Sequence, residues 1–222
     1  MKYKVIEIFG SIDGEGKRTG QLATFIRLAG CNLRCVYCDT SYSFDTSKAE
    51  EMSLEDILKE VDRIGYHNVT LTGGEPLINK EGAMLLIKSL CEKGYQVNIE
   101  TNGSIDLTDF ISGRDLNNWD VFFTVDYKTK YSLMNDKMNV DSFSCLNIKK
   151  DIVKCVVASR EDMEDALKYL DNLGKFNIWF SPVFGKIKPV ELVDYIKEKN
   201  RQDITVQVQL HKIIWDPEKK GV

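Results

Sequence analysis

The hydrophobic positions along the chain follow two periods that alternate from one end to the other. Apolar residues in short runs or at every second position indicate strands, and apolar residues three or four apart indicate helices. We predict strands over residues 3–9, 23–28, 68–71, 96–100, 121–125, 152–157, 176–180 and 204–210. We predict helices over residues 53–65, 81–93, 161–172 and 189–199. Strands that alternate with helices predict an α/β fold with a parallel sheet.

Local signals place the limits of the first helix. Ser53 and Asp56 have the spacing of a capping box, and Gly65 is a typical helix stop. Two connections, residues 104–118 and 127–150, are long, polar and poorly periodic. We therefore predict a single domain over residues 1–222, built as an open, partial (βα) barrel with some helices shortened or missing.

The polar motifs come directly after the predicted strands. They occupy residues 31–38, 72–76, 101–103, 126–128 and 181–182. In parallel βα folds the loops at the carboxyl ends of the strands converge over one edge of the sheet. The sequence therefore predicts that the chemistry gathers at this edge.

Composition excludes some classes of function. The formal net charge is −4 and the pI is about 5.4, which argues against a nucleic-acid surface, because phosphate contacts need concentrated Lys and Arg. No apolar run approaches the ~20 residues that span a bilayer, and the first residues alternate as a strand does, unlike a signal peptide. We expect a cytoplasmic protein with no membrane partner.

Three of the six cysteines form a cluster with C-x3-C-x2-C spacing, namely Cys31, Cys35 and Cys38. Thiolates are soft ligands that select zinc, copper(I) or iron–sulfur clusters. A structural zinc site needs four ligands, and the sequence shows no fourth ligand nearby. Three thiolates on a four-iron cube would leave one iron open to another ligand. Of the other cysteines, Cys91 and Cys155 lie in apolar patterns typical of core positions.

The spacing, with Tyr37 before the last cysteine, resembles the signature of the radical S-adenosylmethionine superfamily. Residues 72–76, Thr-Gly-Gly-Glu-Pro, match the second motif of that superfamily at the next strand end. Paired glycines at this motif allow backbone groups to approach a ligand closely. The resemblance implies a 4Fe–4S cluster whose open iron binds S-adenosylmethionine and whose electron cleaves it to a 5′-deoxyadenosyl radical.

Further motifs resemble one family within that superfamily, the 7-carboxy-7-deazaguanine synthases. They cover residues 7–16, 24–31, 38–40, 100–103 and 208–212, so the resemblance spans nearly the whole chain. It implies a queuosine-pathway lyase that converts 6-carboxy-5,6,7,8-tetrahydropterin to 7-carboxy-7-deazaguanine and releases ammonia. It also implies that the radical takes a hydrogen from the pterin carbon bearing the carboxylate and returns it after ring contraction.

The same resemblance implies a role for individual residues. Cys31, Cys35 and Cys38 would hold the cluster, and Thr40 would bind Mg²⁺ beside the substrate carboxylate. The residues implied to contact S-adenosylmethionine are Tyr37, Cys38, Asp39, Gly74, Asp126, Tyr127, Lys128 and Ser181. The residues implied to bind the pterin are Ile12, Asp13, Gly14, Glu15, Arg27 and Thr72. A homodimer and a reducing partner such as flavodoxin are implied as well.

Elementary chemistry is consistent with the implied substrate site. Arg27 can bind a carboxylate through two hydrogen bonds, and Glu15 can accept from the N–H groups of a pterin. Without the resemblance, Arg27 would be interpreted as a salt bridge at a strand end and Thr40 as a turn hydroxyl. The sequence departs from the family pattern in two motifs. Asp13 stands where Gln is common, and Asp126-Tyr127 stands where Ser-Pro is common.

Two other functions are considered. A glycyl-radical-enzyme activating enzyme shares the cluster loop and the Gly-Gly-Glu-Pro turn, but it would need an open groove for a large protein partner. A zinc-stabilised binding module without catalysis would need a hidden fourth ligand, and it leaves the motifs at four further strand ends unexplained. The polar tail, residues 215–222, is predicted either to cover the pocket or to be disordered.

Overall fold

The computed structural model describes residues 1–217 and 219–222, and its strands in these ranges form one open sheet. The order is β3-β1-β2-β4-β5-β6-β7-β8-β9. Pairing is antiparallel between β1 and its two neighbours and parallel from β2 to β9. The strands are β1 Lys2–Ile12, β2 Leu22–Leu28, β3 Glu50–Ser53, β4 Asn68–Gly73, β5 Gln96–Thr101, β6 Val121–Asp126, β7 Ile152–Val157, β8 Ile178–Pro182 and β9 Ile204–Val206. The predicted open α/β architecture is confirmed.

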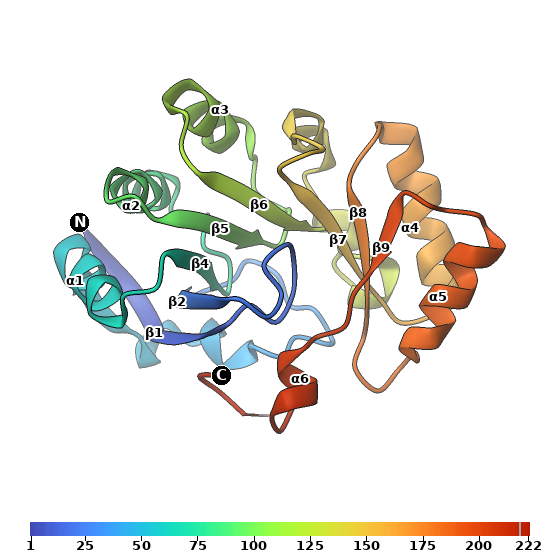
Figure 1. The fold of residues 1–222 in the computed structure, drawn as a ribbon, viewed down its shortest axis with the longest axis horizontal. Helices are drawn as coiled ribbons and strands as arrows, with labels where there is room; N and C mark the ends of the chain where they lie inside the picture. The colour runs from blue at the N-terminus through green and yellow to red at the C-terminus, as the bar shows by residue number, and fades with distance from the viewer. Residues whose placement is uncertain (218) are drawn as a thin grey trace.

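Five helices surround the outside of the curved sheet, and a short sixth lies near the C-terminus (Figure 1). The α-helices are α1 Leu54–Ile64, α2 Lys80–Glu92, α3 Thr108–Asn117, α4 Arg160–Leu173, α5 Pro189–Glu198 and α6 His211–Ile214. Short 3-10 helices are Ser41–Phe44, Thr46–Lys48, Lys130–Ser132, Asn135–Lys137 and Val140–Cys145. Among the described residues, none of the helices combines the length and hydrophobicity that a bilayer span requires.

The hydrophobic core lies between the sheet and its covering helices. Every second residue of the central strands is buried there, including Leu71, Ile99, Phe123, Cys155 and Phe180. Burial of these side chains supplies most of the stabilisation, at roughly 25 cal/mol per Å² of apolar surface. Cys155 is a core residue as predicted. Because side chains alternate along a strand, the intervening residues point to the opposite, concave face.

Local signals placed α1 correctly. The N–H of Asp56 donates to the Ser53 hydroxyl at 3.1 Å, and the N–H of Ser53 donates to the Asp56 carboxylate at 3.2 Å. Gly65 ends the helix with φ of 79°, a conformation that glycine adopts without strain. The predicted capping box and helix stop are therefore confirmed.

The structure departs from the sequence pattern at several elements, and β3 and α6 are among those not predicted. Residues 104–118 contain α3, which we had not predicted because its apolar periodicity is weak and it contains Gly113. Buried Phe110 and an ion pair between Arg114 and Asp151 at 2.7 Å hold this helix in place. The last strand ends at Val206 rather than at 210. The connection 127–150 holds only 3-10 helices, as the prediction of shortened or missing helices required.

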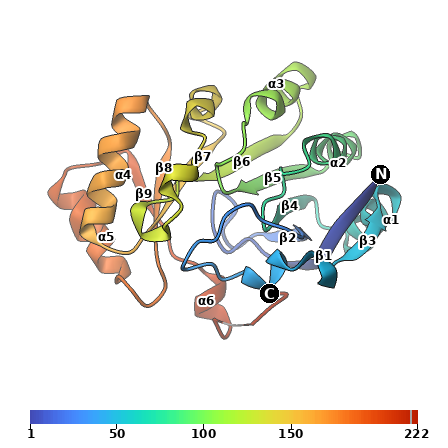
Figure 2. The same ribbon diagram turned by 180° about the vertical axis from the view of Figure 1, so that it is seen from behind.

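The chain returns from β9 towards β1 through its final residues. In Figure 1, α6 lies below the sheet, and the C-terminus lies near β1, at the opposite end of the strand order from β9. Figure 2 shows the same return from behind. The C-terminal segment, defined as residues 207–217 and 219–222, therefore runs from the β9 end of the sheet back towards β1.

Candidate active site

Three cysteines lie on the loop that follows β2, at the carboxyl edge of the sheet. Cys31, Cys35 and Cys38 are free and half-buried. The N–H of Gly30 donates to the Ser43 carbonyl at 2.7 Å, and the N–H of Glu75 donates to the Gly30 carbonyl at 2.8 Å. The start of the cysteine loop is thus fastened on both sides by backbone hydrogen bonds.

The surroundings of the sulfurs fit soft metal ligands. Burial raises the pKa of Cys31, and two donors oppose that rise, the Leu33 N–H at 3.4 Å and the Asn102 side-chain amide at 3.6 Å. Burial also raises the pKa of Cys35, opposed by the charge of Lys128. Buried thiolates need compensating positive charge, which iron supplies. Three free thiols, with N–H donors directed at one of them, therefore fit an iron–sulfur cluster.

Gly73 and Gly74 pack directly against the backbone of the cysteine loop. A Cβ atom on Gly74 would lie 2.0 Å from the carbonyl oxygen of Gly30, and one on Gly73 would lie 2.1 Å from that of Leu28. No side chain fits at either distance. The paired glycines are thus required for contact between β4 and the cysteine loop, a role that the sequence alone did not reveal.

Glu75 connects this turn to the loop after β5. Its carboxylate accepts from the Thr101 hydroxyl at 2.8 Å and from the N–H groups of Asn102 and Leu77 at 2.6 and 3.1 Å. Burial raises the pKa of Glu75 to about 7, and the donors from Asn102, Thr101 and Leu77 oppose that rise. The loops that follow β2, β4 and β5 are therefore held as one unit.

Alternating charges cross the concave face beside these loops. We call Lys128, Asp126, Lys154, Glu15 and Ser181 the ionic row. Lys128 Nζ lies 2.5 Å from the carboxylate of Asp126, whose other oxygen lies 3.3 Å from Lys154 Nζ. Lys154 Nζ also lies 3.2 Å from Glu15, which accepts from the Ser181 hydroxyl at 3.0 Å. The row joins residues that were predicted to bind S-adenosylmethionine to one predicted to bind the pterin.

The pKa directions follow from this packing. Burial would raise the pKa of Asp126, but Lys128 and Lys154 hold it below its ordinary value. Burial would lower the pKa of Lys154, yet Asp126, Glu15 and Glu100 hold it well above its ordinary value. Burial raises the pKa of Glu100 to about 7. The concave face thus holds buried, mutually compensating charges beside the cysteine loop.

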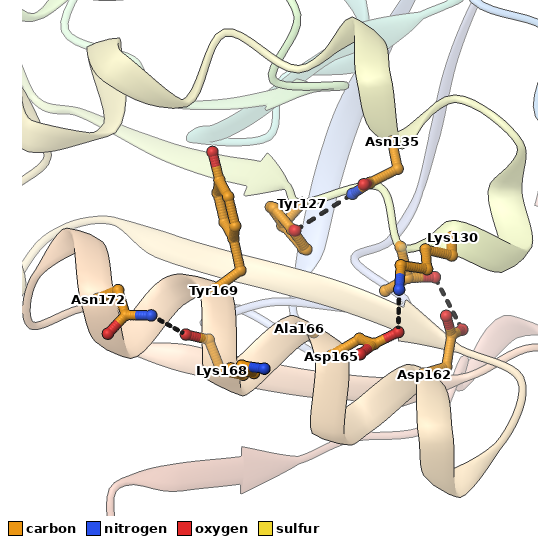
Figure 3. A pocket seen from close by; sticks show the side chains of 10 residues that line it. Tyr127, Lys130, Asn135, Asp162, Asp165, Ala166, Lys168, Tyr169 and Asn172 are labelled. Atoms are coloured by element: carbon orange, nitrogen blue, oxygen red, sulfur yellow. Dashed lines mark hydrogen bonds and ion pairs between the residues drawn. The ribbon is translucent and has the colours of Figure 1, made fainter.

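The side chain of Tyr127 does not join this group. It stacks on Tyr169 with ring centroids 5.7 Å apart, and its hydroxyl accepts from the Asn135 side-chain amide at 3.1 Å. Figure 3 shows both tyrosines at a pocket of about 270 Å³, with Lys130 paired to Asp165 nearby. Only the backbone of Tyr127 can therefore serve the predicted cofactor contact. Its N–H donates to the Lys154 carbonyl at 2.7 Å.

Tyr37 lies between the cysteine loop and the 127–150 connection. It stacks with Tyr131, with ring centroids 6.2 Å apart, and Lys128 Nζ lies 5.9 Å from the centre of its ring. Burial raises the pKa of Tyr37. These contacts place the ring of Tyr37, whose residue lies between Cys35 and Cys38 in the chain, beside Lys128 of the ionic row.

Asp13 is directed away from the row, into the floor of the concave face. Its carboxylate accepts from Arg18 Nε at 2.9 Å and from the Thr70 hydroxyl at 2.6 Å, and Asp13 is 1% exposed. Arg18 also donates to the carbonyls of Val69 and Gln96 at 3.1 and 3.2 Å. Arg18 thus anchors to the sheet the loop that follows the last residue of β1, Ile12. The side chain of Asp13 is already committed to the protein.

Arg27 is held at the other end of the concave face. Its Nε donates to Glu7 at 2.7 Å, and Glu7 also accepts from the Tyr42 hydroxyl at 2.9 Å. The salt bridge considered for Arg27 therefore exists, and its guanidinium retains further N–H donors for a ligand. Thr72 lies opposite Arg27 on the neighbouring strand β4, because the two are register partners, and Thr72 is largely buried.

The C-terminal segment contacts two loops of the site. The Leu210 N–H donates to the Gly14 carbonyl at 3.0 Å, and Lys212 Nζ lies 2.9 Å from the carboxylate of Asp39. Burial lowers the pKa of His211, which lies beside Gly14 and near Glu15. This segment joins the predicted pterin loop to the cysteine loop.

Thr40 and the end of the C-terminal segment also lie close to the cysteine loop. Thr40, predicted to bind Mg²⁺, has its hydroxyl 3.7 Å from the sulfur of Cys38. Lys220 Nζ lies 4.2 Å from the ring centre of Tyr42, so this part of the tail lies against the site. Glu218 belongs to the tail that is predicted either to cover the pocket or to be disordered, and it lies outside the described residues.

Some site residues had no predicted role, and sequence signals existed for two of them. Lys154 is a charged residue inside the apolar run 152–157, and buried lysines are rare unless they are paired. Asn102 stands in a polar triplet directly after a strand. The pairing of Arg18 with Asp13 and Thr70 had no such signal, because Arg18 lies in a polar loop where exposed arginine is the ordinary expectation.

Comparison with known proteins gives one consistent result. Residues 25–117 match the Radical SAM superfamily. The chain is 44% identical over the full length of both chains to a 7-carboxy-7-deazaguanine synthase from Clostridium acetobutylicum. It is 32% identical to the 7-carboxy-7-deazaguanine synthase of Leptospira interrogans, and the match covers 100% of this chain and 99% of that one. The crystal structure of QueE from Escherichia coli superposes with a TM-score of 0.73 at 24% identity, covering 94% of each chain.

Proposed function

The chain belongs to the 7-carboxy-7-deazaguanine synthase family of radical S-adenosylmethionine enzymes. From the geometry of its site we propose which residues carry out the reaction of this family. The reaction converts 6-carboxy-5,6,7,8-tetrahydropterin to 7-carboxy-7-deazaguanine and releases ammonia, a step of queuosine biosynthesis. The observation that carries the proposal is the ionic row itself. It reaches from Glu15 to Lys128, which lies over the ring of Tyr37 in the cysteine loop. This connection supports the proposal that cluster, cofactor and substrate bind at one edge of the sheet.

We propose that Cys31, Cys35 and Cys38 hold the 4Fe–4S cluster. The remaining groups at this edge would bind S-adenosylmethionine through the backbone of Tyr37 to Asp39, Gly74, Ser181 and residues 126–128. When bound, the cluster and cofactor supply the radical chemistry. The chain supplies orientation and exclusion of water, because Lys128 and Lys154 are 8% and 5% exposed.

For the substrate we propose binding between Arg27, Thr72 and the loop of Ile12 to Glu15. The acceptor oxygens of Glu15 suit the N–H groups of a pterin, and the free donors of Arg27 suit its carboxylate. For Asp13 the proposal is limited to a supporting role, because its carboxylate binds Arg18. Mg²⁺ at the Thr40 hydroxyl is part of the proposal, since Mg²⁺ takes few protein oxygens and keeps several waters.

Three broader features also belong to the proposal. All described strands join one sheet, which supports a single domain over residues 1–222. Six free cysteines suit a reducing compartment such as the cytoplasm. A homodimer and an electron donor of the flavodoxin type follow from the family resemblance, and sedimentation and reduction assays would test them. The activating-enzyme and zinc-module alternatives are not favoured, because the full-length relatives are synthases.

The decisive experiment is anaerobic turnover of the reconstituted and reduced protein. S-adenosylmethionine, Mg²⁺ and 6-carboxy-5,6,7,8-tetrahydropterin are added, and 7-carboxy-7-deazaguanine is followed by mass spectrometry. We expect product from the wild type, none from Cys35→Ala, and unchanged product from the control Cys91→Ala. Cleavage of the cofactor without conversion of the pterin would reject the proposed substrate and return attention to a protein substrate.

A further inference from the structure

The side-chain amide of Asn102 is held in one orientation beside the cysteine loop. Its oxygen accepts from the N–H and the hydroxyl of Ser104 at 2.9 and 2.6 Å. Its nitrogen donates to the Asn32 side-chain oxygen at 3.0 Å and lies 3.6 Å from the sulfur of Cys31. Exchanging the oxygen and nitrogen would set donor against donor at Ser104, so the network fixes which end faces the sulfur.

The backbone of Asn102 is held equally firmly. Its N–H donates to the buried carboxylate of Glu75 at 2.6 Å, and Asn102 is 7% exposed. The Ser104 hydroxyl in turn accepts from the Asn32 amide at 2.7 Å, which closes a ring of hydrogen bonds among Asn102, Ser104 and Asn32 beside Cys31. The amide therefore does not reorganise when the charge on the sulfur changes.

The three thiols differ in the hydrogen-bond donors and charges that lie near their sulfur atoms. Cys31 has two N–H donors near its sulfur, from Leu33 and Asn102. Cys38 has only the Thr40 hydroxyl at 3.7 Å among the described contacts. Cys35 has the charge of Lys128 nearby. A side-chain amide is directed at Cys31 specifically.

We propose that Asn102 is a positioning residue that donates a hydrogen bond to the Cys31 thiolate and thereby raises the reduction potential of the cluster. Hydrogen bonds to cysteine sulfurs stabilise the more negative, reduced form of an iron–sulfur cluster. The inference rests on the cluster of the proposed function, but not on the identity of the substrate. Asn102 would act through Cys31, easing the entry of the electron that starts turnover.

The test compares two Asn→Asp substitutions in the reconstituted protein. Asn102→Asp keeps the shape and the acceptor for Ser104, but it replaces the donor at Cys31 by an oxygen. Asn32→Asp is the matched control, because it places the same charge one residue from Cys31 and retains the amide of Asn102. The readouts are iron and sulfide content, a potentiometric titration followed by electron paramagnetic resonance, and the hyperfine coupling of exchangeable protons to the reduced cluster.

We expect Asn102→Asp to lower the ratio of reduced to oxidised cluster, at the wild-type midpoint potential, by about threefold or more. We expect Asn32→Asp to lower it clearly less, and one exchangeable-proton coupling to vanish only in Asn102→Asp. Equal shifts in both variants, or no shift in Asn102→Asp at wild-type iron content, would overturn the inference.

A second variant decides the matter if Asn102→Asp does not retain iron. Asn102→Ala removes the donor without adding charge, and we expect a smaller shift in the same direction. An unchanged midpoint in Asn102→Ala would overturn the inference. Failure of the wild type itself to assemble a cluster would instead reject the proposed function, so the two failures are distinguishable.

Discussion

The two faces of the sheet are formed by the same strands but are stabilised by different interactions. On the helix-covered face, Leu71 and Phe123 are almost completely buried among other apolar side chains. On the concave face, the neighbouring Thr72 and Thr124 and the more distant Lys154 are also buried, yet they are polar or charged. Because burial of a charge is costly unless it is paired, the concave face depends on specific partners, whereas the helix-covered face depends on shape and volume.

This difference shows how the strands divide their tasks. The apolar face stabilises the fold by removing surface from water, and no single contact on it is chemically unique. The carboxylates and ammonium groups of the ionic row each have a named partner, such as Asp126 for Lys128. Charges held in place without solvent are also what a site needs in order to bind charged ligands without reorganising. Stability and chemistry are thus separated by the alternation of side chains along each strand.

Adjacent residues of β4 allow the sharpest test of this separation. We expect Leu71→Ala to lower the free energy of unfolding by ~2–5 kcal/mol, because it leaves a cavity in the core. Thr72→Val has nearly the same shape as the wild type, so we expect a change of less than ~1 kcal/mol, but weaker pterin binding by about tenfold. Chemical denaturation and equilibrium binding of the pterin measure the two effects.

The outcome that would break the comparison is a reversal between these neighbours. If Thr72→Val destabilised the protein as much as Leu71→Ala and left binding intact, the concave face would be a second structural core. Leu71→Ala, measured at a temperature where it remains folded, should keep wild-type affinity for the pterin.

Removal of the central cation of the ionic row has the next largest effect. We expect Lys154→Met to lower the free energy of unfolding by about 3 kcal/mol, because Glu15 loses its cationic partner and Asp126 loses one of two. Denaturation of the cluster-free protein measures this loss. The control Lys168→Met removes an exposed lysine and should change stability by less than ~0.5 kcal/mol.

Equal stability of Lys154→Met and the wild type would show that the row contributes nothing before ligands bind. A loss of stability with unchanged cofactor affinity would place the row in the fold alone. Both results would blur the division between the two faces.

The pH dependence of stability should show an effect of similar size or less. Burial raises the pKa of Glu100 to about 7, from an ordinary value of 4.5, so the folded protein binds this proton more tightly than the unfolded chain does. The free energy of unfolding should therefore fall as pH rises from about 4.5 to about 7, by up to roughly 3 kcal/mol for this group. Glu100→Gln should remove that part of the slope.

Denaturation midpoints of the cluster-free protein at pH 5 and pH 7.5 test this expectation. Glu75, whose pKa burial also raises to about 7, should leave a residual slope in Glu100→Gln. The exposed Glu81→Gln serves as the control and should follow the wild type. Parallel curves for Glu100→Gln and the wild type would contradict the raised pKa of Glu100.

Patterns carried by near neighbours in the chain were predictable. The spacing of Cys31, Cys35 and Cys38 indicated a metal cluster because ligand identity and loop length are properties of eight consecutive residues. The ends of α1 were predictable because a capping box joins residues three apart. The helix α3 was not, because its stability comes from contacts of Phe110 and Arg114 with distant parts of the chain.

The sequence by itself determined the alternation of strands and helices, the edge at which the polar motifs gather, and the chemistry of the thiols. Only the tertiary structure decided which charges meet. Lys154 and Glu15 are 139 residues apart, and their contact depends on the order of strands in the sheet. It also decided that Asp13 binds Arg18 and that the ring of Tyr127 lies away from the row. Short-range patterns are encoded by covalent neighbours, whereas ion pairs between distant residues form only where packing brings them together and excludes water.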